Sequence, residues 1–231
     1  MYALGEIVLV VIGILIALQI NNWNQNQILV KEELQILKSL HKELNKNKNR
    51  FDKAYEFHLN RRENIETIIS IKANDFSMDS LISIVRSINS NYTFNPHQGI
   101  YNSIINSGKI ELISNATLKE RIAGLQDLIK DFQEEEENVR NFTFQNIYNL
   151  QLEAKLLDNY KVRRGLVKPS KDEEHRIKEN YVKYIESDIY ESQLTLLSGY
   201  MKDIFNEGPV LREELYSIIE LIETEIEILS K

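Results

Sequence analysis

The scarcity of helix-breaking residues is the sequence feature that most constrains the fold. The 231 residues include only eight glycines and three prolines, and neither residue occurs between Asn24 and Asn95. Because glycine and proline punctuate strands and turns, so long a stretch without them favours long helices over a strand-and-turn architecture. The chain has no cysteine, which excludes a disulfide framework, thiol catalysis and cysteine-ligated metal. Its net charge of −7 argues against nucleic acid as a partner.

The N-terminal apolar segment predicts a single transmembrane helix. Ile7–Leu18 is apolar throughout, but it spans only about 18 Å as a helix, against a hydrocarbon core of roughly 30 Å. Counting from Tyr2 to Trp23 extends the helix to about 31 Å and places an amphipathic aromatic residue at each membrane interface. We therefore predict a transmembrane helix over residues 2–23, within an anchor formed by residues 1–24.

Two alternatives compete with the transmembrane interpretation. A cleavable signal peptide needs a basic N-terminal region and a small-residue cleavage site, whereas no Lys or Arg precedes Lys31 and the run ends in "QINNWNQNQ". A buried helix of a soluble protein is the other alternative, because short apolar runs are ambiguous.

A contact face is predicted within this helix. Glu6, Gly13 and Ala17 share one side at 100° per residue. Gly13 and Ala17 form a small-xxx-small pair, which lets helix backbones approach closely in lipid. This pattern indicates a protein partner or a homo-oligomer formed through helices. In the alternative interpretation, Glu6 extends to water and the small residues carry no contact.

An a/d-like apolar stripe follows the anchor and predicts a long stalk helix over residues 25–74, ending at about residue 72. Polar residues interrupt the stripe at His41, Lys48, His58 and Arg62. Its apolar members are Val30, Leu34, Leu37, Leu44, Phe51, Tyr55, Ile65 and Ile69.

Residues 75–231 predict a helical bundle domain that packs back on the stalk. Short helices are expected at 79–90 and 100–106, and Gly108 is suited to a left-handed helix cap. A second long helix is expected from Thr117 towards Leu157, capped by Thr117 with Glu120 or by Asn115. A helix resumes near Asp172, and Gly208-Pro209 is expected to break or kink the chain before a final heptad-patterned helix. The predicted fold class is all-α, an antiparallel bundle on a membrane stalk.

No residue pattern predicts an enzyme, a cofactor or a metal site. Asp172 and His175 share a helix face but lack further ligands. Glu134–Glu137 point around a helix and are expected to form a solvated face. Ser39 and Lys42 match Ser-x-x-Lys without the accompanying motifs, so we interpret the match as chance.

The segment "FNPHQGIYNSIINSGKIELI" (94–113) is rich in aromatic, histidine, proline and glycine residues. Phe94, His97, Tyr101 and Lys109 indicate either a recognition corner with an aromatic pocket or a corner that only fixes two helices. Ligand binding near residues 94–112 is therefore the alternative function.

The stretch "YALGEIVLVVIGILIALQINNWN" (2–24) resembles the N-terminal signature of an uncharacterised family of single-span membrane proteins from Bacteroidota. The stretch "YNSIINSGKIELISNATLKERI" (101–122) resembles the second recurring block of that family, a domain-of-unknown-function family. The resemblance implies an architecture and a location, but no catalytic residues. Family members commonly carry a basic stretch before the span, and this chain begins at Met1-Tyr2.

The Lys/Arg count and the family resemblance predict opposite orientations of the chain in the membrane. Lys31, Lys38 and Lys42 follow the span and no basic residue precedes it, so the positive-inside rule favours a cytoplasmic domain. The resemblance implies a periplasmic domain. We adopt the periplasmic orientation and predict a non-enzymatic, single-pass inner-membrane protein of the bacterial cell envelope, acting as an interaction or scaffold module.

Overall fold

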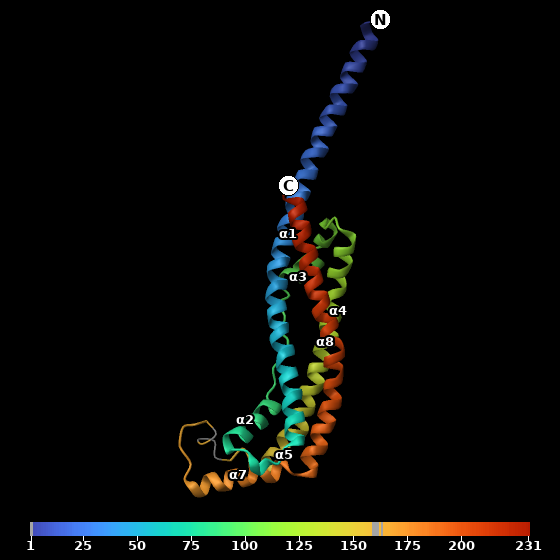
Figure 1. Ribbon diagram of the computed structural model, residues 1–231. Helices are drawn as coiled ribbons and strands as arrows, with labels where there is room; N and C mark the ends of the chain where they lie inside the picture. Colours follow the sequence, from blue (N-terminus) through green and yellow to red (C-terminus); the bar gives the residue numbers. More distant parts are fainter. Residues whose placement is uncertain (1, 159–161, 163) are drawn as a thin grey trace. The chain divides into compact units, whose positions relative to one another are not determined.

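The computed structural model describes residues 2–158, 162 and 164–231, with the side chains of residues 2–6 and 8 outside the description (Figure 1). All regular structure in these residues is helical, which confirms the all-α fold class. The elements are α1 (Tyr2–Ser70), η1 (Ala73–Asp75), α2 (Met78–Asn89), α3 (Gly99–Asn106), η2 (Lys109–Leu112), α4 (Ala116–Phe142), the π-helical turn η3 (Thr143–Ile147), α5 (Tyr148–Glu153), α7 (Lys171–Ile185) and α8 (Asp188–Leu229).

Helix ends follow the local capping chemistry. Ser77 accepts a hydrogen bond from the Ser80 N–H and starts α2. Asn115, and not Thr117, caps α4, because its Oδ1 accepts from the Leu118 N–H at 3.0 Å. Gly108 has φ 71°, in agreement with its predicted left-handed conformation. Ser170 forms a capping box with Glu173 at the start of α7.

The contacts divide the chain into two compact units. Unit 1 comprises residues 1–47, 97–124 and 214–231, and unit 2 comprises residues 48–96 and 125–213. Each unit therefore contains a part of α1, a part of α4 and a part of α8.

Unit 1 is built around the first part of α1. The C-terminal end of α8 (red in Figure 1) runs antiparallel beside α1, and the first turns of α1 extend past the end of α8. His41 on α1 bonds Glu223 on α8 at 2.7 Å. The apolar core of this unit includes Leu37, Leu40, Leu44, Ile104, Ile113, Leu118, Ile122, Leu215, Ile218 and Ile222.

Unit 2 combines the second part of α1 with α2, α5, α7 and the larger parts of α4 and α8. α7 lies against α2 and η1, where Lys178 Nζ donates to the Asn74 carbonyl at 3.0 Å. Its core includes Phe51, Ile65, Leu81, Ile88, Phe94, Phe132, Ile147, Tyr181, Tyr190, Leu194, Leu197, Ile204 and Leu211.

The buried stripe of α1 differs in register from the predicted one. Leu37, Leu44, Phe51 and Ile65 are buried as expected. Every second position of the buried stripe lies one residue before the predicted position. Leu34, Tyr55 and Ile69 are therefore not buried. Buried residues at a regular 4,3 spacing are Glu33, Leu37, Leu40, Leu44, Asn47, Phe51, Ala54, His58, Arg61, Ile65 and Ile68, and Ile36 and Glu43 are buried beside them.

Of the break or kink predicted at Gly208-Pro209, the break is wrong, because α8 continues through both residues from Asp188 to Leu229. Gly208 has a packing role instead. A Cβ at this position would overlap the ring of Tyr55, so only glycine lets that ring lie against α8. The unforeseen interruption lies earlier, at Glu186 and Ser187, where α7 ends and α8 begins.

Candidate functional site

The first part of α1 exposes apolar side chains on every side. Its exposed large hydrophobic residues from Ile7 to Leu29 are between 47% and 71% accessible. Consecutive residues point 100° apart on a helix, so exposure at all the described positions of the run leaves each face of this segment open there. Within the described residues, no helix is both long and apolar enough to cross a membrane; the side chains of residues 2–6 and 8, inside the predicted span, lie outside that description.

The predicted contact face is only partly described. Gly13 and Ala17 are exposed, and a Cβ added at Gly13 would meet no atom within 4 Å. The side chain of Glu6 lies outside the described residues. Gly13 and Ala17 thus present an open helix surface.

The predicted recognition corner is divided between the two units. Phe94 belongs to unit 2, where it is buried against Phe51 and Phe132. His97, Tyr101 and Lys109 belong to unit 1.

Buried polar side chains of α1 hold the unit 1 part of this corner. Glu43 accepts from the backbone N–H groups of Ile100 and Tyr101 at 2.8 and 2.9 Å, and so caps α3 from another helix. Asn47 exchanges hydrogen bonds of 2.7 Å with the backbone N–H and C=O of His97. Tyr101 is buried, and its hydroxyl donates to the Ala123 carbonyl at 3.3 Å.

A second buried carboxylate fixes the segment before α4. Glu33 accepts from the N–H and the hydroxyl of Ser114 at 2.6 and 2.8 Å. Asn115 donates to Glu225 at 2.6 Å, and Arg121 forms a bidentate pair with Glu214. The corner is thereby fixed by side chains that the sequence shows only as polar residues scattered along α1 and α8.

Lys109 lies at the edge of a groove in unit 1. The groove has a volume of about 240 Å³. Its lining residues are Glu32, Gln35, Ile36, Ser39, Ile100, Ser103, Ile104 and Lys109.

Unit 2 contains a buried contact between a histidine and a glutamate that sequence reasoning missed. His58 and Glu136 are 2% and 1% exposed, and His58 Nε2 lies 2.9 Å from a Glu136 carboxylate oxygen. The other oxygen accepts from the Phe94 N–H at 2.8 Å. The expectation that Glu134–Glu137 form a solvated face is therefore wrong for Glu136, whose carboxyl group is buried because it satisfies groups from two other segments.

A second buried polar cluster in unit 2 centres on Arg61, which is 1% exposed. Its Nη2 donates to Thr143 Oγ1 at 2.7 Å, at the first residue of the π-helical turn η3. Burial lowers the pKa of Arg61 to about 10, against the opposing influence of Tyr190 and Tyr148, so the guanidinium stays charged at neutral pH. π-Helical turns often occur at functional sites.

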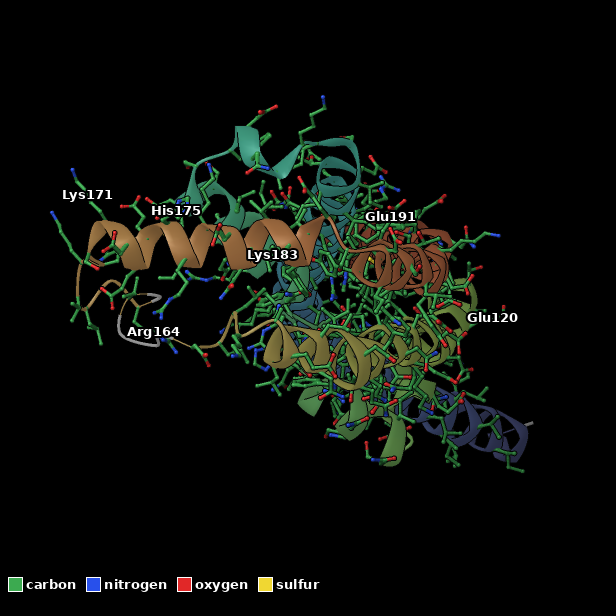
Figure 2. All side chains as sticks on the ribbon, turned by 90° about the horizontal axis from the view of Figure 1, so that it is seen from below. Glu120, Arg164, Lys171, His175, Lys183 and Glu191 are labelled. Carbon is green, nitrogen blue, oxygen red and sulfur yellow. The ribbon has the colours of Figure 1, made fainter. Side chains whose placement is uncertain are left out.

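The patterns considered from the sequence as metal-binding or catalytic are Asp172 with His175 and Ser39 with Lys42. Among the described residues, no group of His, Asp and Glu side chains is arranged to hold a metal ion. His175 is exposed on α7 (Figure 2), and its Nε2 lies 3.7 Å from Glu179 Oε1. The Ser39 hydroxyl donates to the Gln35 carbonyl at 2.9 Å, as helix serines commonly do.

Comparison with known proteins gives one match. Residues 6–165, more than half of the chain, match the model of a family described as "Family of unknown function (DUF6090)". No curated protein and no solved structure matches the chain. The chain belongs to this family of unknown function.

Proposed function

We propose that this protein is a non-enzymatic, single-pass membrane protein of the bacterial cell envelope, whose helical units form an interaction or scaffold module. The observation that carries the proposal is the exposure of apolar side chains all around α1 between Ile7 and Leu29. A partner helix needs only an apolar stripe, whereas lipid surrounds a helix on every side. The aromatic residues Tyr2 and Trp23 stand at the spacing of the two membrane interfaces.

The three buried glutamates have a structural role, and this supports the non-enzymatic part of the proposal. Glu33, Glu43 and Glu136 each accept from backbone N–H groups. These hydrogen bonds stabilise the fold. The open surface at Gly13 and Ala17 fits a partner helix or a second copy of this chain in the membrane.

Membrane fractionation tests the anchor. The full chain is expected in the membrane pellet, resistant to high salt and alkaline carbonate. A double substitution, Val11→Arg with Ile14→Arg, should release a large fraction of it, because each arginine at mid-span costs about 2.5–3.5 kcal/mol. Both positions are exposed, so the substitutions remove no packing contact.

The matched control is Gln25→Arg with Gln27→Arg, which adds the same charge at exposed positions beyond Trp23. This variant should remain in the pellet. A soluble oligomer of the unmodified chain would contradict the anchor and indicate that copies of α1 cover one another.

Orientation is tested by cysteine labelling. The chain has no cysteine, so Thr195→Cys, at an exposed position of α8, provides a unique thiol. A periplasmic domain predicts labelling by a membrane-impermeant maleimide once the outer membrane alone is permeabilised. Labelling that requires opening of the inner membrane would instead establish the cytoplasmic orientation that the Lys/Arg count favours.

Ligand binding near residues 94–112 is the second candidate function. The groove beside Lys109, with Glu32, Ser39 and Ser103 in its lining, favours it. The hydrogen bonds that Asn47 and Glu43 make to the corner weigh against it, because they occupy the backbone groups that a ligand would need.

A further inference from the structure

A polar pocket lies in unit 2, between α1 and the segment that joins α2 to α3. It has a volume of about 530 Å³, within the range of small-molecule sites. Its lining residues are Asn49, Arg50, Lys53, Asn91, Tyr92, Thr93 and Asn95. None of them is an aliphatic or an acidic residue. The pocket therefore offers an apolar ligand little burial, and no carboxylate in its lining opposes an anion.

Two cations give this pocket a positive charge, although the net charge of the chain is −7. Arg50 and Lys53 are exposed and lie one turn apart on α1. The Asn95 carbonyl accepts from Arg50 Nη1 at 2.6 Å, but it is neutral and leaves the charge uncompensated. Among the described residues neither cation forms an ion pair, and the neighbouring Asp52 pairs with Arg212 at 3.1 Å instead. The pocket thus presents two accessible, unpaired cations to an anion.

The segment around Phe94 is fixed in place, so this wall of the pocket is already formed. The Phe94 N–H donates to Glu136 and its carbonyl accepts from Gln133, at 2.8 and 2.9 Å. Asn95 Nδ2 donates to the Thr93 hydroxyl at 3.1 Å. Because a ligand does not have to order this segment, the entropic cost of binding is lower.

Neutral polar groups complete the lining. Among the described residues, the side-chain amides of Asn49 and Asn91 and the hydroxyl of Tyr92 form no hydrogen bond. Amides and phenols both donate and accept, and so do the hydroxyl groups of a sugar. Tyr92 is 46% exposed, so its ring also offers a flat apolar face. This set of groups fits a ligand with many hydroxyl groups better than it fits a bare ion.

We propose that this pocket binds an anionic sugar, either a sugar acid or a sugar phosphate. Arg50 and Lys53 contact the carboxylate or phosphate. The free amides bond the sugar hydroxyl groups, and the sugar ring lies on Tyr92. This site is independent of the membrane anchor and of the groove beside Lys109, which belongs to unit 1.

Titration calorimetry of the purified full chain at pH 7, in a detergent without a sugar or phosphate headgroup, tests the site. The probes are D-glucuronate and D-glucose 6-phosphate, compared with D-glucose and inorganic phosphate at equal ionic strength. At least one anionic sugar is expected to bind saturably, about tenfold or more tightly than glucose and phosphate. The anionic sugar that binds more tightly identifies the anionic group. No saturable binding of either anionic sugar, or equally tight binding of glucose or inorganic phosphate, would overturn the proposal.

Two variants place the ligand in this pocket. Lys53→Glu reverses a charge at an exposed position and should weaken binding about ten- to a hundredfold. Asn49→Ala removes one exposed amide and should weaken binding about two- to tenfold. The matched control is Lys202→Glu, the same charge reversal at an exposed position of α8 outside the lining. It should bind as the unmodified chain does. Unchanged binding in either pocket variant, or an equal loss in Lys202→Glu, would contradict the site.

Discussion

Replacing Glu136 by alanine is expected to lower the free energy of unfolding by about 3–5 kcal/mol, because it leaves two buried groups without their acceptor and each such group costs about 1–3 kcal/mol. The carboxylate is almost inaccessible and serves both His58 and the Phe94 N–H, at 2.9 and 2.8 Å. Alanine would leave the His58 imidazole and a buried backbone N–H without their acceptor. Urea unfolding of the full chain in detergent, followed by circular dichroism, measures the change.

Glu137→Ala is the matched control, since it makes the same substitution at the next position. Glu137 is exposed and pairs with Arg140 at 3.1 Å. Exposed pairs one turn apart contribute about 0.5 kcal/mol or less. Equal losses in the two variants would show that Glu136 is not buried in a specific pair.

Replacing Phe51 by alanine is also expected to lower the free energy of unfolding by about 3–5 kcal/mol. Phe51 is 0% exposed, and its ring lies 5.1 Å from the ring of Phe132 and 5.4 Å from that of Phe94, both in edge-to-face geometry. Truncation removes the edge-to-face contacts and leaves a cavity that the surrounding rings can fill only in part.

Phe144→Ala provides the comparison for this change. Phe144 is 54% exposed and stacks on Tyr148 at the surface, with ring centroids 5.1 Å apart. The free energy of unfolding of this variant should fall by no more than about 0.5–1 kcal/mol. A Phe51→Ala variant that unfolds at nearly the same urea concentration as Phe144→Ala would contradict the aromatic core of unit 2.

The run of four glutamates shows why the site could be predicted only in part. Glu134–Glu137 are chemically identical in the sequence, and a solvated face was the reasonable expectation. The structure buries one of them, Glu136, because His58 and the Phe94 backbone approach it. Those partners are 78 and 42 residues away along the chain, so no local pattern identifies them.

Gly208 shows that the local sequence also cannot predict whether a helix continues through a Gly-Pro pair. A Gly-Pro pair is a strong local signal for a helix break, yet α8 continues through it. Helix propensity is a weak constraint that tertiary packing can override. Here the close approach of the Tyr55 ring requires glycine inside the helix.

The sequence by itself determined the helical class, most helix ends and the heptad period of α1. These features depend on interactions within about one helical turn, such as the capping of α4 by Asn115 and of α7 by Ser170. Only the tertiary structure decided which residues occupy the buried stripe. It buries Glu33, Asn47 and Arg61, each one residue before a predicted position, and it buries His58, where the predicted stripe has a polar interruption. A polar side chain is buried where a partner from a distant segment satisfies it, and that partner exists only once the chain has folded.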